Sequence, residues 1–449
     1  MASTKLTRTF GSGGSRVKWT WSGWIKRTKI GVEQIIFCAY ENSNNQTQCK
    51  FDSSDQLYFN DESSGNTNGR IVSNAKYRDT NAWYHMVFVW DKNNSTSADR
   101  IKMYVNGERV TSFSDTGNAP SDTSAMNNDS LGREHEIGVK NGSNDYFDGC
   151  MSHIHFCDGY AYTPTDFGET DSTTGEWKIK TSPSVSYGTT GYWILKDGNT
   201  VTDSSANSNT WTIGGTLTET KDNPSNVFAT LNPLVRHQGT LDLGNTRFGT
   251  TGSWRGIPAT IGLSKGKWYW EFKQVVQTNW SQNGIMSSKE NGGYTGIYST
   301  YVGNNSGGLA LNSGNGDFYH DGSSNPYSAG TWFSGGLSAG DIISVALDVD
   351  ASKIWFAKNG TWGNSSNPAT GSNGIDFSGD TSFTSHKPYF PACSVDQCEC
   401  AYNFGNGYFG TTAVATNSGN GYSDADGKAK FNYEVPTNFK AITTRGLNL

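Results

Sequence analysis

The chain has 449 residues, of which 35 are Lys or Arg and 41 are Asp or Glu, so its formal net charge is −6. It is rich in Gly (54), Trp (15), Tyr (21) and Phe (22), whereas only 17% of its residues are charged, against roughly 25% in typical domains. This composition argues against a disordered chain, which lacks aromatics, and against a coiled coil, which is rich in Ala, Glu, Lys and Leu. It also argues against a nucleic-acid binder, which usually has a basic footprint.

Apolar and aromatic residues recur at every second position in short runs that Gly, Asn, Asp and Ser separate. A period of two is the signature of half-buried strands. We therefore predict strands at 18–25, 83–90, 101–105, 341–348 and 354–358. No segment of 12 or more residues keeps a helical period, so the pattern predicts an all-β protein.

Two Asn-Gly pairs directly follow predicted strands, Asn106-Gly107 in the first half and Asn359-Gly360 in the second. Asn-Gly is the strongest short-range hairpin signal, because both central residues of a type I′ turn need positive φ. We therefore predict a tight hairpin in each half and two sandwich domains of related design. The Gly-, Ser- and Asn-rich stretches 363–381 and 411–428 are predicted to be long surface loops.

Several motifs of the first half occur in a recognisable order: 83–85 (WYH), 99–107 (DRIKMYVNG), 146–149 (YFDG), 167–171 (FGETD) and 203–211 (DSSANSNTW). Together they resemble the laminin-G/pentraxin-like concanavalin A jelly roll, in a version common in structural proteins of tailed phages. The resemblance implies a jelly-roll β-sandwich over residues 1–215.

The motifs of the second half are 266–271 (GKWYWE), 340–348 (GDIISVALD), 355–360 (WFAKNG), 389–392 (YFPA) and 403–405 (NFG). They resemble a SPRY domain, which is another concanavalin A-like sandwich. The segments around 229–233 and 436–441 are similar to phage proteins that join these two domains. The expected fold is thus two concanavalin A-like jelly-roll β-sandwiches in tandem, with domains at 1–215 and 229–449 and a linker at 216–228.

The resemblance also implies a function. We expect a bacteriophage virion protein, made in the host cytoplasm, that acts as a tail fibre or tail-associated adhesin. Its expected partners are other virion proteins, further copies of itself, and a host-surface glycan or outer-membrane receptor, with no nucleic acid and no membrane insertion. Two alternatives stay open: a capsid or tail decoration protein that binds only virion partners, and a carbohydrate-binding module of a bacterial surface protein.

Catalysis needs its own test, because concanavalin A-like folds also include glycoside hydrolases. These enzymes use two carboxyl groups about 5–9.5 Å apart, which the laminarinase-like version carries on one strand as Glu-x-Asp-x-x-Glu. The nearest stretches here, 134–136 (EHE) and 169–171 (ETD), lack that spacing. The sequence also has no Gly-x-Ser-x-Gly elbow and no His-Glu-x-x-His motif. We predict that the chain is not an enzyme.

This interpretation requires no cofactor, but the sequence contains two groups of residues of the kinds that ligate metals. His153, His155 and Cys157 alternate on a predicted strand and would share one face. Zinc needs four ligands in a closed structural site, so packed side chains are the simpler interpretation. Calcium fits the oxygen-rich turn better, and we predict a calcium site whose candidate ligands are Asp203, Asn207 and Asn209.

Aromatic side chains provide the candidate ligand-binding residues. Those in alternating runs are predicted to be core: Trp19, Trp21, Trp83, Trp90, Trp268, Trp270 and Trp355. Aromatics in polar, Gly-rich surroundings differ, because an apolar ring with a polar tip suits both saccharides and protein partners. The predicted ligand-binding residues are Trp280, Tyr294, Tyr298, Tyr301, Trp332 and Trp362.

Overall fold

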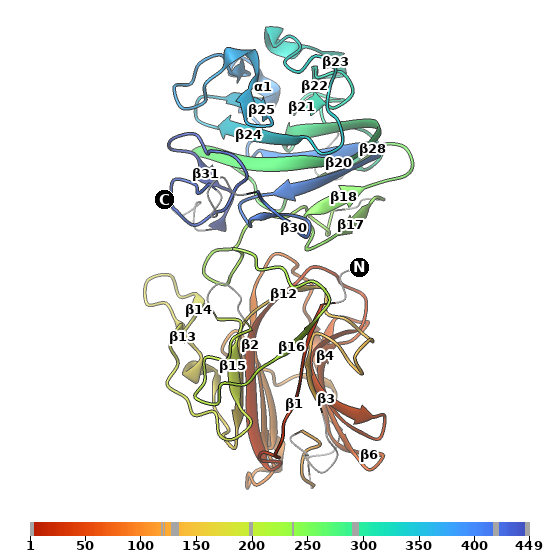
Figure 1. Ribbon diagram of the computed structural model, residues 1–449, viewed down its shortest axis with the longest axis vertical. Helices are drawn as coiled ribbons and strands as arrows, with labels where there is room; N and C mark the ends of the chain where they lie inside the picture. The colour runs from red at the N-terminus through yellow and green to blue at the C-terminus, as the bar shows by residue number, and fades with distance from the viewer. Residues whose placement is uncertain are drawn as a thin grey trace. The chain divides into compact units, whose positions relative to one another are not determined.

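The computed structural model describes residues 4–117, 120, 122–126, 134–196, 201–235, 238–289, 296–415 and 422–444. The chain divides into two compact units (Figure 1). The first domain is Met1–Glu219 with Asn223–Ser225, and the second is Thr220–Asp222 with Asn226–Leu449.

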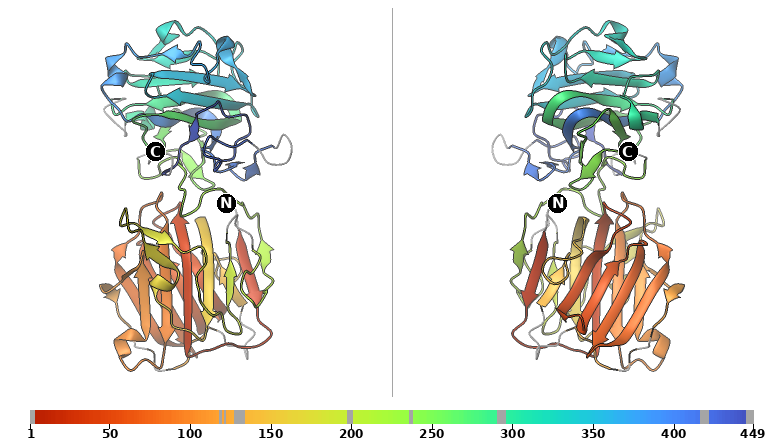
Figure 2. Two further views of the ribbon diagram at one scale, coloured as in Figure 1. Left: turned by 90° about the vertical axis from the view of Figure 1, so that its left-hand side faces the viewer. Right: turned by 90° about the vertical axis from the view of Figure 1, so that its right-hand side faces the viewer.

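The first domain has two antiparallel sheets that pack face to face (Figures 1 and 2). The larger sheet has the order β10 (Phe113–Asp115), β6 (Asn66–Lys76), β5 (Gln56–Ser63), β4 (Asn45–Phe51), β3 (Gln34–Asn42), β11 (Glu134–Ile137), β1 (Lys5–Thr9) and β16 (Thr212–Gly214). The smaller sheet has the order β15 (Tyr192–Ile194), β12 (Gly149–Asp158), β2 (Lys18–Arg27), β7 (Tyr84–Asp91), β8 (Ile101–Val105) and β9 (Glu108–Arg109). A separate hairpin is formed by β13 (Gly168–Thr170) and β14 (Trp177–Ile179).

The core of the first domain lies between these sheets and is mainly aromatic. Trp19 stacks on Trp90 in the neighbouring strand, with ring centroids 6.4 Å apart. Across the sandwich, Trp21 stacks on Phe37 at 5.9 Å. Large rings at alternate positions of both inner faces explain how a chain with few aliphatic residues fills a sandwich.

The second domain is built around two long strands, β20 (Lys267–Met286) and β28 (Phe390–Asn403), which pair along most of their length. Neighbouring strands extend this sheet on both sides: β17 (Thr240–Asp242), β18 (Arg247–Gly249), β19 (Arg255–Pro258), β21 (Gly308–Asn312), β22 (Phe318–His320), β23 (Ser323–Ser324) and β24 (Ile342–Asp348). The remaining strands are β25 (Lys353–Lys358), β26 (Thr361–Trp362), β27 (Ile375–Asp376), β29 (Tyr408–Phe409), β30 (Thr412–Ala413) and β31 (Lys440–Ala441).

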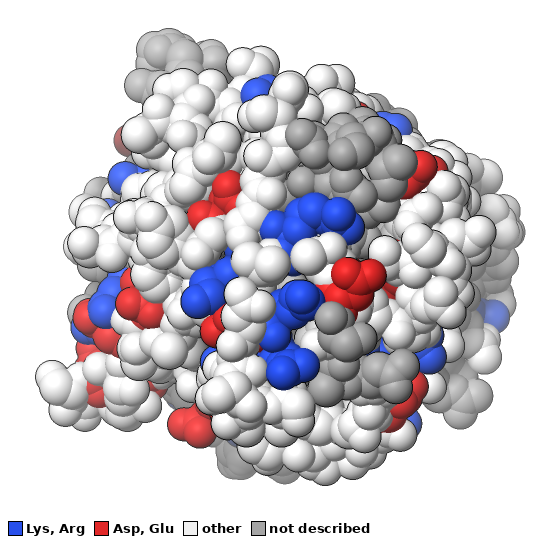
Figure 3. All heavy atoms as spheres, turned by 90° about the horizontal axis from the view of Figure 1, so that it is seen from below, with Lys and Arg blue, Asp and Glu red and all other residues white. Residues whose placement is uncertain are grey.

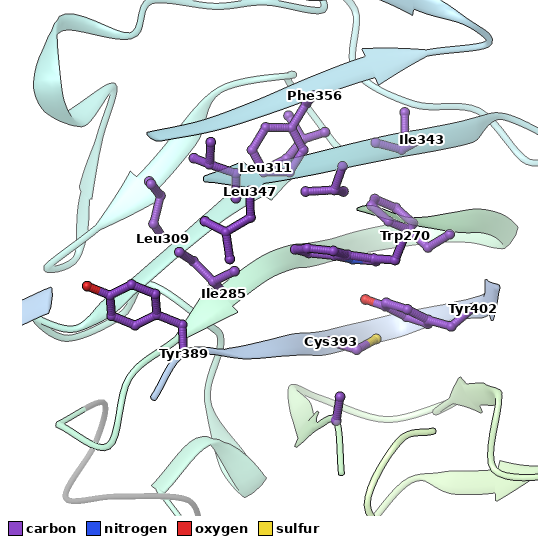
Figure 4. Packing of buried hydrophobic residues seen from close by; sticks show 14 of the residues in the cluster. Trp270, Ile285, Leu309, Leu311, Ile343, Leu347, Phe356, Tyr389, Cys393 and Tyr402 are labelled. Atoms are coloured by element: carbon purple, nitrogen blue, oxygen red, sulfur yellow. The ribbon is translucent and has the colours of Figure 1, made fainter. Parts of the chain in front are cut away.

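Figure 4 shows the core of the second domain, in which Trp270 and Ile285 of β20, Leu347 of β24 and Tyr402 of β28 point toward one another. All four side chains are at most 1% exposed. β20 contributes side chains to this core near both of its ends, Trp270 near the start and Ile285 near the end.

Helices are short. The described ones are α1 (Thr381–Thr384) and the 3₁₀ turns η1 (Ser97–Asp99), η3 (Pro164–Asp166), η5 (Gly296–Ser299), η6 (Pro326–Ser328) and η7 (Gly363–Ser365). Within the described part of the chain, no helix has the length and apolar character needed to cross a membrane.

The structure confirms the all-β prediction and the five predicted strands, which correspond to β2, β7, β8, β24 and β25. Both Asn-Gly turns have the expected backbone, with φ values of 50° at Asn106 and 85° at Gly107, and of 50° at Asn359 and 84° at Gly360. All seven tryptophans predicted to be core are 0–7% exposed: Trp19, Trp21, Trp83, Trp90, Trp268, Trp270 and Trp355.

The prediction of a surface loop at 363–381 is wrong in part. Ile375 pairs with Ile354 of β25, and the side chains of Ile375 and Phe377 are 2% and 0% exposed. The indole N–H of Trp355 also donates to the main-chain oxygen of Ser372 at 2.9 Å. Two buried apolar residues, a strand pairing and a hydrogen bond thus fix this segment to the core.

Candidate ligand-binding face of the second domain

The middle of β20 carries the most exposed aromatic side chain with a predicted binding role. The stretches 268–272 and 281–286 of this strand are buried, whereas Val276, Thr278 and Trp280 are exposed, Trp280 by 51%. The pairing with β28 shifts register twice here, once before Val276 and once before Trp280. Such bulges bend a strand and redirect its side chains, so a strand held at both ends presents this indole to solvent.

The indole of Trp280 lies against the main chain of the loop between β21 and β22. A Cβ atom at Gly314 would lie 2.3 Å from Cδ1 and 2.4 Å from Nε1 of Trp280, so only glycine allows this approach. The N–H of Gly314 donates to Oδ1 of Asn312 at 2.8 Å, which fixes the loop. The indole ring thus packs against the main chain at Gly314, and about half of its surface stays exposed.

Polar groups are fixed beside this ring. Asp396 of β28 lies opposite Trp280, so their side chains share one face of the sheet. Its Oδ2 accepts from Nδ2 of Asn279 at 2.5 Å. The Nε2 of Gln277 donates to the main-chain oxygen of Asn279 and to Oγ of Ser313, both at 2.9 Å. A carboxylate and amides in fixed positions beside an apolar surface can orient a ligand that carries hydroxyl groups.

Further along the same face, Gln282 supplies an acceptor without a partner. The side chain is 2% exposed, and its Oε1 makes no hydrogen bond within the described residues. The neighbouring Ser394 is occupied: its hydroxyl donates to the main-chain oxygen of Gln282 at 3.0 Å and accepts from the N–H of Val302 at 3.0 Å. A buried acceptor of this kind calls for a donor, either water or a ligand hydroxyl.

A second aromatic pair lies at the other edge of this surface. The rings of Trp254 and Tyr301 are 5.1 Å apart. Trp254 immediately precedes β19, whose Arg255 pairs with Val395, the residue next to Asp396 in β28. Trp254 was not among the sequence-predicted binding residues, although its Gly- and Ser-rich surroundings gave the same signal as Trp280. We call the surface formed by Trp280, Asn279, Asp396 and Trp254 the Trp280 face.

Two other predicted aromatics anchor loops. The indole N–H of Trp332 donates to the main-chain oxygen of Ala329 at 2.9 Å, and its ring packs edge-on against Phe318 at 5.2 Å. Trp362 is half-buried at the end of β26 and packs against the smaller cluster that contains Trp355. A binding role for either stays a prediction.

Two predicted tyrosines cannot be placed on this surface. Tyr294 and the side chain of Tyr298 lie outside the described residues. Of the six aromatic residues predicted to bind ligand, Trp280 and Tyr301 are therefore the two that the structure places on or beside the Trp280 face.

The predicted calcium ligands form a turn that is held by its own hydrogen bonds. Oδ1 of Asp203 accepts from the N–H groups of Trp193 and Ser205, both at 2.9 Å. Its Oδ2 accepts from N and Nδ2 of Asn209, at 2.8 and 2.9 Å. The Nδ2 of Asn207 donates to two main-chain oxygens. Main-chain donors thus already engage the carboxylate, and calcium binding here stays a prediction.

The residues weighed as zinc ligands are packed among aromatic side chains. A register shift between Ser152 and His155 breaks the alternation of β12, and His153 has a φ of 49°. Nδ1 of His155 lies 2.9 Å from the hydroxyl of Tyr187. Within the described residues, no group of three or more His, Cys, Asp or Glu side chains is arranged to hold a metal ion.

Comparison with known families identifies both domains. Residues 7–166 match the family model of the concanavalin A-like lectin/glucanases superfamily, and residues 267–407 match that of the SPRY domain. The chain therefore carries a concanavalin A-like, laminin-G-type domain followed by a SPRY domain, as its motifs indicated. No match to the chain was found among curated proteins.

Two solved structures are similar to parts of the chain. The SPRY domain of human HERC1 is 16% identical, with a TM-score of 0.30, and the match covers 38% of this chain and 96% of that one. The heptameric SAP-like pentraxin from Limulus polyphemus is 20% identical, with a TM-score of 0.27, and the match covers 36% of this chain and 72% of that one.

Proposed function

We propose that this chain is a virion protein of a tailed bacteriophage, a tail-associated adhesin that binds a host-surface glycan through the Trp280 face. The proposed glycan binding rests on the half-exposed indole of Trp280, which packs against Gly314 and is flanked by the Asn279–Asp396 pair. The proposed assignment to a phage virion is supported by the order of the motifs, which resembles that in structural proteins of tailed phages.

The chemistry of the Trp280 face suits a saccharide. A sugar ring has an apolar C–H face that can lie on an indole, while its hydroxyl groups need fixed donors and acceptors. Asp396 supplies acceptor oxygens, and Asn279 supplies an amide. One such site binds weakly, but several copies on one particle raise the avidity by about 10²–10⁴. The adhesin would therefore act as a homo-oligomer together with other virion proteins.

Binding of the purified full chain to host cells tests this proposal. Trp280→Ala should weaken binding by about tenfold, which corresponds to roughly 1.4 kcal/mol, and the melting temperature should change little because the ring is half-exposed. Val276→Ala is the matched control, since Val276 is 42% exposed on the same strand. Equal binding by wild type and Trp280→Ala would refute a role for this face.

The location of the protein on the particle tests the virion part separately. Immunogold electron microscopy of intact phage with an antibody against the chain should place gold at the tail. Gold over the head would instead support a decoration protein that binds only virion partners. Unlabelled particles, with a working control antibody, would contradict the virion assignment.

A further inference from the structure

Four basic residues meet at the end of the first domain where β2 begins. Asp91 lies opposite Lys18 in the sheet, and its N–H donates to the main-chain oxygen of Arg100 at 2.7 Å. Lys92 follows Asp91, and Arg16 lies two residues before Lys18. Figure 3 views the molecule from this end, and Lys and Arg side chains gather near the middle of that view with a few acidic ones between them.

Within the residues that the structure describes, three of these cations have no carboxylate partner. Nζ of Lys18 lies 3.6 Å from Oδ1 of Asp91. The Nε atom of Arg16 donates to one main-chain oxygen, and the guanidinium of Arg100 donates to two others. Among the described residues, none of Arg16, Lys92 and Arg100 forms an ion pair. Main-chain oxygens position the two arginines without cancelling their charge.

An exposed aromatic pair adjoins these charges. The rings of Tyr160 and Tyr162 stack at 5.5 Å with an angle of 15° between their planes, and Tyr160 is 41% exposed. The N–H of Gly159 donates to the main-chain oxygen of Lys18 at 3.0 Å. Oγ1 of Thr20 donates to the oxygen of Tyr160 and accepts from the N–H of Tyr162. These bonds fix the two tyrosines beside the first residues of β2, where Lys18 lies.

We propose that this end of the first domain, formed by Arg16, Lys92, Arg100 and Tyr160 with Lys18 beside them, binds an acidic polysaccharide. The cations take the carboxylate or phosphate groups, and the exposed face of Tyr160 takes the apolar face of a sugar ring. This site goes beyond the proposed function and does not rest on it, because it lies in the other domain and uses none of the residues of the Trp280 face.

The charge count favours a polysaccharide over a nucleic acid. Double-stranded DNA carries one charge per about 1.7 Å, and its binding strength grows with the number of phosphates that are neutralised. Three cations in a chain of net charge −6 supply few such contacts. An acidic polysaccharide carries about one charge per sugar unit, so a small number of cations beside one aromatic platform matches it better.

The test measures binding of the full chain to polygalacturonate, with neutral dextran as the uncharged control polymer. Wild type should bind polygalacturonate but not dextran, and added salt should weaken the binding because it screens exposed charges. Lys92→Glu should weaken it by about tenfold, since rim charges steer such complexes. Tyr160→Ala should weaken binding at high salt as well, because its contribution is apolar.

Lys76→Glu is the matched control for charge reversal. Lys76 ends β6, and the main-chain oxygen of the next residue, Tyr77, accepts from Arg27 at the far end of β2. This variant changes the net charge by the same amount, away from the proposed site, and should bind as wild type does. Equal losses in Lys92→Glu and Lys76→Glu would overturn the proposal, as would binding of dextran or tighter binding of an oligothymidylate than of polygalacturonate.

Discussion

Glu271 of β20 offers the sharpest prediction about stability. Its side chain is 0% exposed, and its two oxygens accept four hydrogen bonds. The donors are the hydroxyl of Tyr269 (3.0 Å), Nδ2 of Asn403 (3.3 Å) and the N–H groups of Asn432 (2.9 Å) and Tyr433 (2.8 Å). The carboxyl group thereby ties the C-terminal segment of the second domain to the central strand, and its burial raises the pKa to about 7.

This pKa determines how the carboxyl group of Glu271 makes the unfolding free energy depend on pH. A shift from 4.5 to about 7 corresponds to about 3 kcal/mol. Since the pKa of the folded state lies above that of the unfolded state, the folded protein binds more protons between these two values. The stabilising contribution is therefore fully present below pH 4.5 and is lost as the pH rises through 7. Glu271→Gln cannot lose a proton, so its stability should lack this component.

Urea unfolding of wild type and Glu271→Gln at several pH values between 4.5 and 8.5 measures the effect. The difference in unfolding free energy between the two proteins should change by about 3 kcal/mol across this range, to the disadvantage of wild type at high pH. The variant can be less stable at every pH, because an amide replaces one acceptor oxygen. Parallel pH profiles would refute the reasoning, since they would mean that Glu271 titrates at its ordinary pKa.

Three further predictions concern other sites. Asp55→Asn leaves the fully buried guanidinium of Arg27 without its carboxylate partner at 3.0 Å, and urea unfolding should show a loss of about 3–5 kcal/mol. Gly314→Ala places a methyl group where the indole of Trp280 lies, and host-cell binding should fall about as much as in the Trp280→Ala protein. Asp203→Asn weakens hydrogen bonds to main-chain N–H groups, so calorimetry should show a lower Tm in EDTA and in calcium alike. If calcium instead raised the Tm of wild type but not that of Asp203→Asn, the turn at Asp203 would be a calcium site.

The sequence predicted the elements whose signal is local. Large aromatic residues at every second position identified β2 and β7, because alternate side chains of a strand lie on the same face. The turn at Asn106-Gly107 was predictable because only a few residue types accept two successive positive φ values. The family resemblance of both halves, which rests on the order of such motifs, is confirmed for the concanavalin A-like and SPRY domains.

Features that depend on register between distant strands could not be predicted. The bulge at His153 breaks the alternation of β12, and nothing in the local sequence marks it. Ile375 and Phe377 enter the core from a stretch whose composition is that of a loop, because they pack against β25 and its neighbours. Burial of such isolated residues is decided by tertiary contacts, not by composition.

In the candidate site too, some residues have a local sequence signal and others are identified only by tertiary contacts. Trp280 was found because an aromatic residue in polar surroundings is exceptional, and it is exposed as expected. Asp396 and Trp254 belong to the Trp280 face only because β28 and β19 align them with Trp280 across the sheet. Gln282 could not be singled out either, since its unpartnered Oε1 is apparent only after the surrounding hydrogen bonds are assigned.

The central claim is that the Trp280 face contacts the host surface, and competition for phage adsorption tests it most directly. Host cells are first saturated with the purified full chain, and adsorption of intact phage is then counted. We predict that wild type and Val276→Ala protein block adsorption, whereas Trp280→Ala protein at the same concentration does not. Equal blocking by all three proteins, or blocking by none, would contradict the claim.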